Sequence, residues 1–268
     1  MPELPELAVL SEKLEVMLKG QSILWLKVYN HLVIHGIKIE DFEKQLKGMT
    51  FTSIRADGKF VLMNFENLFE LVVNPMLAGR FHYIEDQKAP MKTTIFLIRT
   101  ESGTLLFNDR KQMSRVYLVK AGFYDSIAGF LDRGPSALDE SFTLDKFRKR
   151  LRRRNGQIKN VLRNQKFVKG IGNAYADEIL LYAGIIPFRK RSSLSDDEIE
   201  RLYSAMRTVL MKYQVLVSKK TLKELATEKR DFLMIHGKGG GICPLCGGRI
   251  SEITSNRFKT NYCQTCQK

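Results

Sequence analysis

The sequence predicts an α+β protein whose first half is rich in strands and whose second half is helical. In the first half, short segments of β-branched and aromatic residues alternate with turn pairs such as Asp57-Gly58 and Ser102-Gly103. In the second half, apolar residues recur at helical spacing, and the chain closes with two Cys-x-x-Cys pairs. A length of 268 residues suffices for about two domains with a substantial core.

The elements of the first half follow from these patterns in order. A helix is expected over residues 6–19, because Leu7, Leu10 and Leu14 recur at helical spacing. Strands are expected at residues 23–28, 50–55, 60–65, 69–73, 93–98 and 104–107. The Gly134-Pro135 pair and its polar neighbours mark residues 131–140 as a linker.

The second half opens on a basic stretch. Residues 146–166 hold ten Lys and Arg residues and no acid, a pattern that is more often a solvated face than a binding site. Two helices are expected at residues 157–165 and 173–183, with a tight turn at residues 167–172 between them. A third helix is expected to begin at a capping box formed by Ser195 and Glu198.

The turn between the first two of these helices has the composition of a phosphate clamp. Gly170 and Gly172 allow backbone amides to approach a ligand closely, and Asn173 stands where an N-cap is expected, at the positive end of a helix dipole. Taken alone, the same residues also fit an ordinary helical hairpin. The adjoining basic stretch favours the clamp.

The amino terminus carries the residues of amine-based covalent catalysis. Removal of Met1 leaves Pro2 as the terminal residue, and a terminal amine titrates near about 7.7–8.0, so part of it is uncharged at neutral pH. A secondary amine that attacks an aldehyde-level carbon forms an iminium, which withdraws electrons from the adduct. Glu3 is adjacent and is placed to move protons, whereas Glu6 either assists it or braces the segment.

Charge and cysteine usage narrow the class of protein. The chain has 44 Lys and Arg against 29 Asp and Glu, a net charge of +15, which favours a polyanionic partner, although ribosome-associated and membrane-surface proteins are also basic. Without a charged-then-apolar leader or an apolar run near 18 residues, we expect a soluble, cytoplasmic protein with no membrane partner. No cysteine outside the two pairs is left for disulfides, which fits a reducing compartment.

The two cysteine pairs predict a zinc site. Cys243 and Cys246 are separated from Cys263 and Cys266 by sixteen residues, which is the spacing of a four-thiolate zinc ribbon with a hairpin between its ligand pairs. With four protein ligands and no open position, the zinc is expected to be structural, and no catalytic metal or organic cofactor is expected. A redox dithiol is the alternative, and such ribbons also serve as folding staples only.

These motifs together resemble the formamidopyrimidine-DNA glycosylase and endonuclease VIII family of base-excision repair enzymes, over almost the whole chain. The start of the chain matches at Pro2-Glu3-Leu4-Pro5-Glu6, and the hairpin lysine matches at Gly58-Lys59-Phe60. The interdomain boundary matches at Gly134-Pro135, and the helix–two-turn–helix motif matches at residues 170–178 with the preceding Lys159. The finger matches at His236-Gly237-Lys238 followed by the cysteine pairs.

The resemblance implies the fold and its division. An N-terminal two-sheet β-sandwich with a flanking helix is expected at residues 1–130, and an interdomain linker at residues 131–140. A helix–two-turn–helix DNA-binding domain is expected at residues 141–235, followed by a four-cysteine zinc finger at residues 236–268. DNA is expected to bind in a basic cleft between the two domains of a monomer.

The resemblance also implies a mechanism on damaged duplex DNA. Pro2 would attack C1′ of a flipped nucleotide, displace an oxidised base and form an iminium. Glu3, with Glu6 and Lys59 in the catalytic set, would assist the proton transfers of β- and δ-elimination. The expected DNA contacts are Lys159, Gly172, Asn173, Tyr175, Arg257 and Lys259, with Leu77, Lys111, Gln112 and Met113 near the base-pair gap.

Departures from the family pattern leave the lesion open. The finger has five residues between Arg257 and Cys263 instead of four, so either one residue is inserted there or Lys259 shares the arginine's role. Lys111, Gln112 and Met113 stand where an arginine and a phenylalanine are expected. A leucine at position 77 resembles the pattern of the endonuclease VIII branch, because the oxidised-purine enzymes have a methionine there. The opening hexapeptide instead resembles that of the formamidopyrimidine branch. Formamidopyrimidines, oxidised purines and oxidised pyrimidines therefore remain candidate substrates.

Two other classes of function compete with this interpretation. One is a damaged-DNA-binding protein that keeps the zinc finger but has no catalytic activity. The other is an enzyme that uses its terminal proline on small molecules, for which the basic stretch and the finger would have no purpose. Pro2 and Glu3 argue against the first alternative, because a binding protein needs neither residue.

Overall fold

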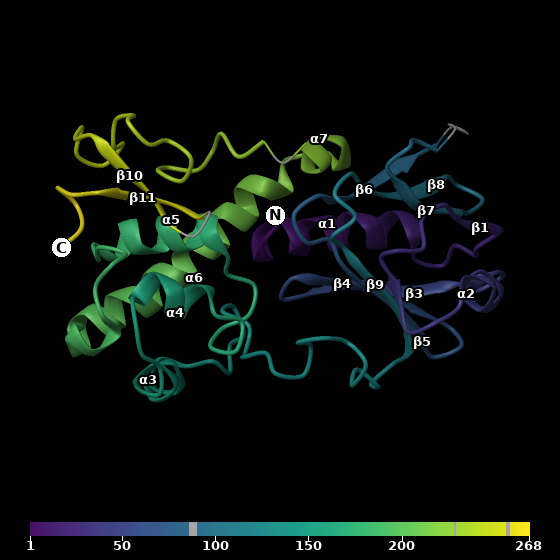
Figure 1. The fold of residues 1–268 in the computed structure, drawn as a ribbon, viewed down its shortest axis with the longest axis horizontal. Helices are drawn as coiled ribbons and strands as arrows, with labels where there is room; N and C mark the ends of the chain where they lie inside the picture. Colours follow the sequence, from purple (N-terminus) through teal and green to yellow (C-terminus); the bar gives the residue numbers. More distant parts are fainter. Residues whose placement is uncertain (86–89, 228, 256–257) are drawn as a thin grey trace. The chain divides into compact units, whose positions relative to one another are not determined.

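The computed structural model describes residues 1–85, 90–227, 229–255 and 258–268 (Figure 1). Its contacts group the chain into two compact units. Unit 1 comprises residues 1–131 and 217–229, and unit 2 comprises residues 132–216 and 230–268. Within the part of the chain that the structure describes, no helix is both long and apolar enough to cross a membrane.

Unit 1 is a sandwich of two sheets, as the sequence predicted. One sheet has four strands in the order β1-β7-β8-β6, and the other has five in the order β2-β9-β5-β4-β3. The bounds are β1 Trp25–Val28, β2 Ile34–His35, β3 Phe51–Asp57, β4 Phe60–Phe65, β5 Phe69–Asn74, β6 Gly79–Ile84, β7 Thr94–Arg99, β8 Thr104–Asp109 and β9 Arg115–Lys120. Apolar side chains from both sheets, such as Phe96 and Leu71, form one buried core.

Three helices accompany the sheets of unit 1. Helix α1, Leu4–Leu18, contributes Leu7, Leu14 and Leu18 to the core and packs along β3. Helix α2, Ile39–Leu46, buries Phe42 and Leu46 in the same core. Helix α7, Leu222–Thr227, packs against β6 although it is far along the chain.

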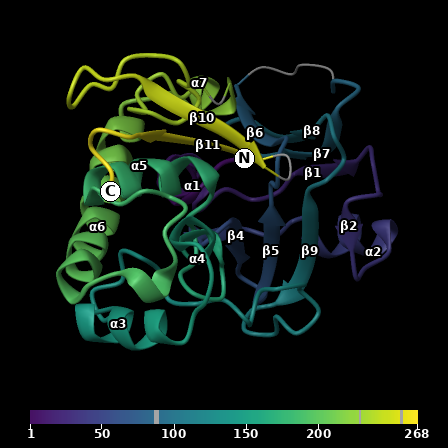
Figure 2. The same cartoon turned by 60° about the vertical axis from the view of Figure 1, so that its left-hand side comes forward.

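Unit 2 combines a helical core with a terminal hairpin. Its elements are α3 Leu144–Arg152, α4 Ile158–Arg163, α5 Asn173–Ala183, the short 3-10 helix η1 Arg191–Ser193, α6 Asp196–Ser218, β10 Ile250–Ser255 and β11 Phe258–Cys263. Helix α5 is buried along most of its length and ends at Gly184, whose φ of 68° suits a left-handed cap. Figure 2 shows the β10–β11 hairpin lying along α5.

The predicted elements are confirmed where the apolar pattern was strong. Strand β4 and helix α5 have the predicted bounds, and the Ser195–Glu198 capping box is present, with Ser195 N–H donating to Glu198 Oε2 over 2.9 Å. Strands β2, β6 and β9 and helices α2, α3 and α7 were not predicted. Strand β6 escaped notice because it begins at Gly79 and carries Arg80 and His82 on its half-buried face.

Candidate active site and metal centre

The amino-terminal segment is held by a capping box at the start of α1. Glu3 is the N-cap, and its side chain accepts from the backbone of Glu6. In return, Glu6 Oε2 accepts the N–H of Glu3 over 3.0 Å. Only 2% of Glu3 is exposed, so the carboxylate is fixed in place next to Pro2. Of the two roles considered for Glu6, bracing is the one that this geometry supports.

Strand register brings three predicted site segments to one end of unit 1. Lys59 lies in the β3–β4 turn, where Gly58 adopts a φ of 65°. Leu77 lies in the loop at residues 75–78, and residues 110–114 form the next such loop. The two loops run side by side, because their ends are paired: Asn74 with Arg115, and Gly79 with Asp109.

Helix α1 places the amino terminus at the same end. Gly20 N–H donates to Phe51 O over 2.8 Å, and Phe51 N–H donates to Gln21 O over 3.0 Å, so α1 ends beside the start of β3. Fifteen helical residues span about 22 Å and seven strand residues about 23 Å, so the start of α1 reaches the Lys59 turn. Pro2, Glu3, Lys59 and the two loops therefore gather at one end of unit 1. Figure 1 shows the start of α1 at the end marked N.

A buried carboxylate shapes the loop that carries Lys111, Gln112 and Met113. Asp109 is 1% exposed and accepts backbone N–H groups from Lys111, Met113 and Ser114 over 2.9, 2.8 and 2.7 Å. Burial alone would raise the pKa of Asp109, but these hydrogen bonds outweigh it and lower the pKa. The three predicted residues lie exposed on this braced loop.

Both loops contain a residue with left-handed backbone. Met76 has a φ of 49° and Gln112 a φ of 51°, a conformation that costs energy for residues other than glycine. Leu77 follows Met76 and is 42% exposed. A large apolar side chain on a strained, exposed loop fits insertion into a partner better than a place in the core.

Lys159 is buried, in contrast to a solvent-facing phosphate ligand. Its ammonium lies 2.7 Å from Asp177 Oδ1 and donates to Thr260 Oγ1 over 2.8 Å and to Lys259 O over 3.2 Å. Only 4% of Lys159 is exposed. In this structure the residue fastens α4 to α5 and to the terminal hairpin, and its contact with DNA stays a prediction.

The turn before α5 differs from the expected arrangement in one respect. Gly172 is the N-cap of α5, so the expectation that Asn173 caps the helix was wrong. The Asn173 side chain instead donates through Nδ2 to Lys259 O over 2.7 Å, which joins the turn to β11. Tyr175 is fully buried against Tyr213, and its role in DNA binding also stays a prediction.

The two basic residues expected on the finger differ in what the structure shows. Arg257 lies outside the described residues. Lys259 is on β11, and its ammonium pairs with Glu252 Oε1 of β10 over 2.8 Å while 61% of the side chain stays exposed. Its position on an exposed hairpin leaves it accessible to a polyanion.

The four cysteines form a compact cluster that fits a tetrahedral zinc ion. All four sulfur atoms lie within 4.8 Å of one another, with 3.9 Å between Cys243 and Cys266 and 3.5 Å between Cys246 and Cys263. Zinc–sulfur bonds of about 2.3 Å in a tetrahedron place sulfur atoms about 3.8 Å apart. Gly248 N–H also donates to Cys246 Sγ over 3.4 Å, as expected for a thiolate ligand.

Glu178 anchors the segment that leads into this cluster. Its carboxylate accepts the N–H groups of Met234, Ile235 and His236 over 2.8, 2.9 and 2.9 Å, as well as the hydroxyl of Tyr213. Glu178 is fully buried, and burial followed by the nearby carboxylate raises the pKa of Tyr213 well above its usual value. No pattern in the sequence indicated this role.

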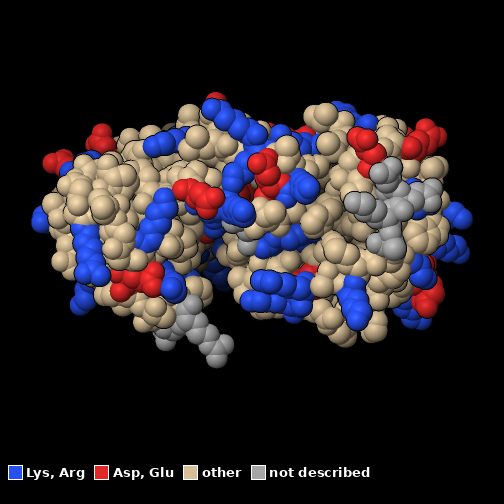
Figure 3. Space-filling view, turned by 90° about the horizontal axis from the view of Figure 1, so that it is seen from above, with Lys and Arg blue, Asp and Glu red and all other residues tan. Residues whose placement is uncertain are grey.

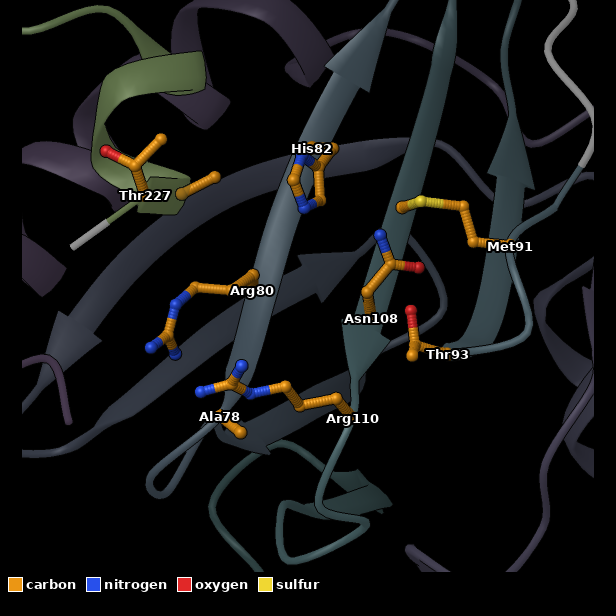
Figure 4. A pocket seen from close by; sticks show the side chains of 9 residues that line it. Ala78, Arg80, His82, Met91, Thr93, Asn108, Arg110 and Thr227 are labelled. Carbon is orange, nitrogen blue, oxygen red and sulfur yellow. The ribbon is translucent and has the colours of Figure 1, made fainter.

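Basic side chains are spread widely over the surface. Figure 3 shows many Lys and Arg side chains and smaller groups of Asp and Glu on the face seen from above. Sequence reasoning missed a group of polar side chains that lines a pocket of unit 1, among them Arg80, Asn108 and Arg110 (Figure 4). Arg110 lies in the Lys111 loop and Asn108 is two residues before it in the sequence, and that position was the available signal.

Comparison with known proteins gives one consistent result. The family model described as the formamidopyrimidine-DNA glycosylase N-terminal domain matches residues 1–116, and the one described as the H2TH domain of the same enzyme matches residues 133–224. The formamidopyrimidine-DNA glycosylase of Pelotomaculum thermopropionicum is 32% identical over 100% of this chain and 99% of its own length. That of Moorella thermoacetica is 32% identical over 94% of both chains.

Solved structures give the same picture. The MutM (Fpg) protein of Thermus thermophilus superposes with a TM-score of 0.86 and 28% identity, covering 99% of this chain and 98% of its own. The Lactococcus lactis Fpg in complex with a FAPY-dG-containing DNA has a TM-score of 0.87 and 26% identity, covering 99% and 100%.

Proposed function

We propose that this chain, which belongs to the formamidopyrimidine-DNA glycosylase family, is a monomeric base-excision repair enzyme that removes oxidised bases from duplex DNA and cuts the strand at the resulting abasic site. The observation that carries the proposal is the gathering of Pro2, Glu3 and Lys59 at one end of unit 1, beside the Leu77 and Lys111 loops. A nucleophile, a fixed carboxylate, a cation and exposed wedge residues are the parts that this reaction needs.

The chemistry starts at the amine of Pro2 once Met1 has been removed. The nitrogen lone pair attacks C1′ of the damaged nucleotide, the glycosidic bond breaks, and the base leaves with its bonding electrons and a proton. Opening of the sugar ring gives an iminium, whose positive charge acidifies the hydrogens on C2′. Formamidopyrimidine is the base that the names of the relatives point to.

Strand cleavage then follows by two eliminations. A proton acceptor of the protein removes a proton from C2′, and the C3′–O bond breaks as the 3′ phosphate leaves. A second proton transfer expels the 5′ phosphate, and water releases the sugar fragment from Pro2. Glu3 is assigned these proton transfers because it is adjacent to Pro2 and fixed by the capping box. Glu6 supports it by accepting the N–H of Glu3.

The DNA is held by residues of both units in this proposal. Lys59 contacts phosphates next to the damaged nucleotide, and the backbone at Gly172 with Lys259 of the hairpin contacts phosphates further along. Leu77, Gln112 and Met113 fill the space that the flipped nucleotide leaves, with Lys111 beside them. The fixed backbone of both loops makes this insertion possible without further ordering.

The four cysteines would hold one structural zinc ion. Zinc bound there would link the two ends of the hairpin and would take no part in the reaction. Cys243 and Cys246 precede β10, whereas Cys263 ends β11 and Cys266 follows it. The ion would therefore fix the strand that carries Lys259 and the Thr260 hydroxyl that accepts from Lys159.

The proposal is tested by borohydride trapping on a duplex with one abasic site. The wild-type chain with Met1 removed is expected to form a covalent adduct, because borohydride reduces an iminium to a stable amine. Pro2→Gly is expected to lose most of the trapping and Glu3→Gln to lose strand cleavage. Glu12→Gln, the same kind of change on the exposed face of α1, is the matched control and is expected to behave as wild type.

Two results of this trapping experiment would contradict the proposal. A wild-type chain with a confirmed proline terminus that binds the duplex but gives no adduct would identify a damaged-DNA-binding protein without catalysis. A glycine terminus is still a primary amine that can form a reducible Schiff base, so the residue that carries the trapped adduct is identified by peptide mapping. An adduct on a lysine side chain, with none on the terminal residue, would place the nucleophile elsewhere.

A further inference from the structure

The basic stretch at residues 146–166 contains cations that the proposed reaction does not use. Some of its ten Lys and Arg residues hold unit 2 together. Lys159 pairs with Asp177, and Arg150 donates to the carbonyls of Lys166 and Phe167 over 2.7 and 3.1 Å. These inward contacts explain one part of the stretch, and the outward face of α3 is the other part.

Three cations on this outward face have no partner of their own. The side chains of Lys149, Arg152 and Arg153 are exposed, and they make no hydrogen bond or ion pair with the residues that the structure describes. Spacings of three and four residues place them on one side of the helix, where like charges repel each other. The helix dipole favours a cation at this end but does not account for a cluster of three. An anionic partner would relieve the repulsion.

The same cations border an open depression on α3. Its volume is about 480 Å³, and Asp145 and Arg148 complete its lining. Arg148 also pairs with Glu200 Oε2 of α6 over 3.2 Å. Glu200 lines a second depression, of about 490 Å³, which α6 and the first residue of α3 border. The two depressions therefore adjoin at the ion pair between Arg148 and Glu200.

The second depression offers an apolar surface with a fixed wall. Leu144, Tyr203 and Met211 line it, and Met211 is 54% exposed. Tyr203 is held in place, because its hydroxyl donates to Phe142 O over 2.8 Å and its ring lies 5.5 Å from that of Phe147. A wall that is already ordered lowers the entropy cost of binding. The volume is sufficient for a large apolar side chain.

The distribution of charge selects the class of partner. Lys149, Arg152 and Arg153 lie on one side of the surface, whereas the carboxylates of Asp145 and Glu200 lie where the two depressions meet. A nucleic-acid strand carries a phosphate at every nucleotide, so it would place phosphates against these carboxylates. A peptide with acidic side chains at one end and an apolar side chain at the other avoids that repulsion.

The surface on α3 lies away from the DNA contacts proposed for unit 2. Figures 1 and 2 show α3 and the β10–β11 hairpin on opposite sides of this unit, with α5 and α6 between them. The proposed phosphate contacts are Lys259, which is on the hairpin, and Gly172, which is at the start of α5. A partner on α3 therefore leaves these contacts open to DNA.

We propose that α3 and the adjoining face of α6 form a docking site for a short acidic segment of a partner protein. Carboxylates of the segment pair with Lys149, Arg152 and Arg153, and an apolar side chain enters the depression lined by Leu144 and Met211. The site does not depend on the glycosylase chemistry, because none of these residues is assigned to that reaction.

Fluorescence anisotropy with a labelled peptide and the full chain tests the proposal. The probe has four aspartates, a glycine and a terminal phenylalanine, and it is expected to bind saturably at low salt. Lys149→Gln combined with Arg152→Gln should weaken binding about tenfold, since each exposed charge pair contributes a factor of up to about five. Lys44→Gln combined with Lys47→Gln removes two charges at the same spacing from α2 and should leave the affinity unchanged.

The apolar end of the site is tested separately. A peptide with alanine in place of phenylalanine should bind about fivefold more weakly, because it buries less apolar surface. Met211→Ser should weaken binding of the phenylalanine peptide and leave binding of the alanine peptide unchanged. Met211 is exposed, so this variant is expected to fold.

Competition with an undamaged duplex separates this site from the DNA-binding surface. Saturating duplex is expected to leave the peptide bound, because the two surfaces are on opposite sides of unit 2. Displacement of the peptide by the duplex would assign the cations of α3 to nucleic acid, and it would overturn the proposal. Absence of saturable peptide binding would also overturn it, as would equal affinity in the wild type and the Lys149 and Arg152 double variant.

Discussion

The ammonium of Lys159 and the carboxylate of Asp177 form an ion pair with 2.7 Å between Nζ and Oδ1, and only 4% of the lysine and none of the aspartate is exposed. The other oxygen of Asp177 lies 2.7 Å from His236 Nδ1 and accepts the N–H of Asn261 over 3.1 Å. Lysine and aspartate thus join α4 and α5 to the hairpin of the metal centre. The most basic stretch of the chain supplies a structural cation here.

Breaking this pair should destabilise unit 2. Lys159→Met leaves the Asp177 carboxylate buried without its ammonium partner, and loss of one partner of such a pair costs about 3–5 kcal/mol. Urea denaturation measures the difference in the free energy of unfolding. Lys149→Met, the same substitution on the exposed face of α3, is the control and should cost less than about 0.5 kcal/mol. Equal stability of the two variants would contradict a buried role for Lys159.

Glu6 should act through Glu3. Glu6→Ala removes the acceptor of the Glu3 N–H, and loss of a cap costs about 0.5–2 kcal/mol. Because Glu3 then loses its fixed position, single-turnover strand cleavage should slow while the fold is retained. Glu6→Gln keeps an acceptor oxygen and should restore most of the rate. A slow Glu6→Gln variant would show instead that the charge of Glu6 takes part in the reaction.

Asp109 should make the stability depend on pH in the acid range. Its pKa is lower in the folded chain than the unfolded value of about 3.9, so its contribution is complete above that value and is lost as the pH falls through the folded pKa. Asp109→Asn should therefore cost about 1–3 kcal/mol at pH 7 and progressively less below about pH 4. Urea titrations of both chains from pH 7 to pH 3 measure this. A constant difference over that range would assign the effect to packing.

Zinc removal should unfold the finger. Elemental analysis is expected to find one zinc ion per chain, and a strong chelator should lower the melting temperature and weaken DNA binding. Cys263→Ser should reproduce both effects without the chelator, because its sulfur is a buried ligand. If the metal-free chain bound DNA as tightly as the metal-loaded chain, the cysteine cluster would not be needed for DNA binding.

Binding to duplex DNA should weaken steeply with salt. Each phosphate contact releases counterions and adds about −0.9 to the slope of log affinity against log salt concentration. Lys259→Gln, at a proposed phosphate contact, should reduce the magnitude of that slope by about one, while Lys120→Gln, at the far end of β9, should leave it unchanged. Fluorescence anisotropy at several salt concentrations measures the slope. A flat dependence would exclude a phosphate-binding surface.

Local patterns were sufficient for most elements. A short segment of β-branched and aromatic residues after the Asp57-Gly58 turn predicted β4, and the Ser195 and Glu198 pair predicted the start of α6. Both signals lie within a few residues of each other. Strand β6 and helix α3 were missed, because each buries few side chains and carries charged ones between them; α3 buries only Phe147 and Leu151. Such elements form because the rest of the fold supplies a surface for their few apolar residues.

By itself the sequence predicted the fold class, the four cysteines that cluster in the structure and Pro2 as the candidate nucleophile, since residue type and close spacing carry that information. Tertiary structure alone decided that Lys159 is buried against Asp177 and that the Asn173 side chain hydrogen-bonds to β11. It also decided that Asn108 pairs across the strands with Arg80 and lines the same pocket. It also decided that the Lys59 turn and the two loops share one end of a sandwich. These relationships join residues far apart along the chain, and they depend on strand register and burial, which are fixed only when the sheets and helices pack together.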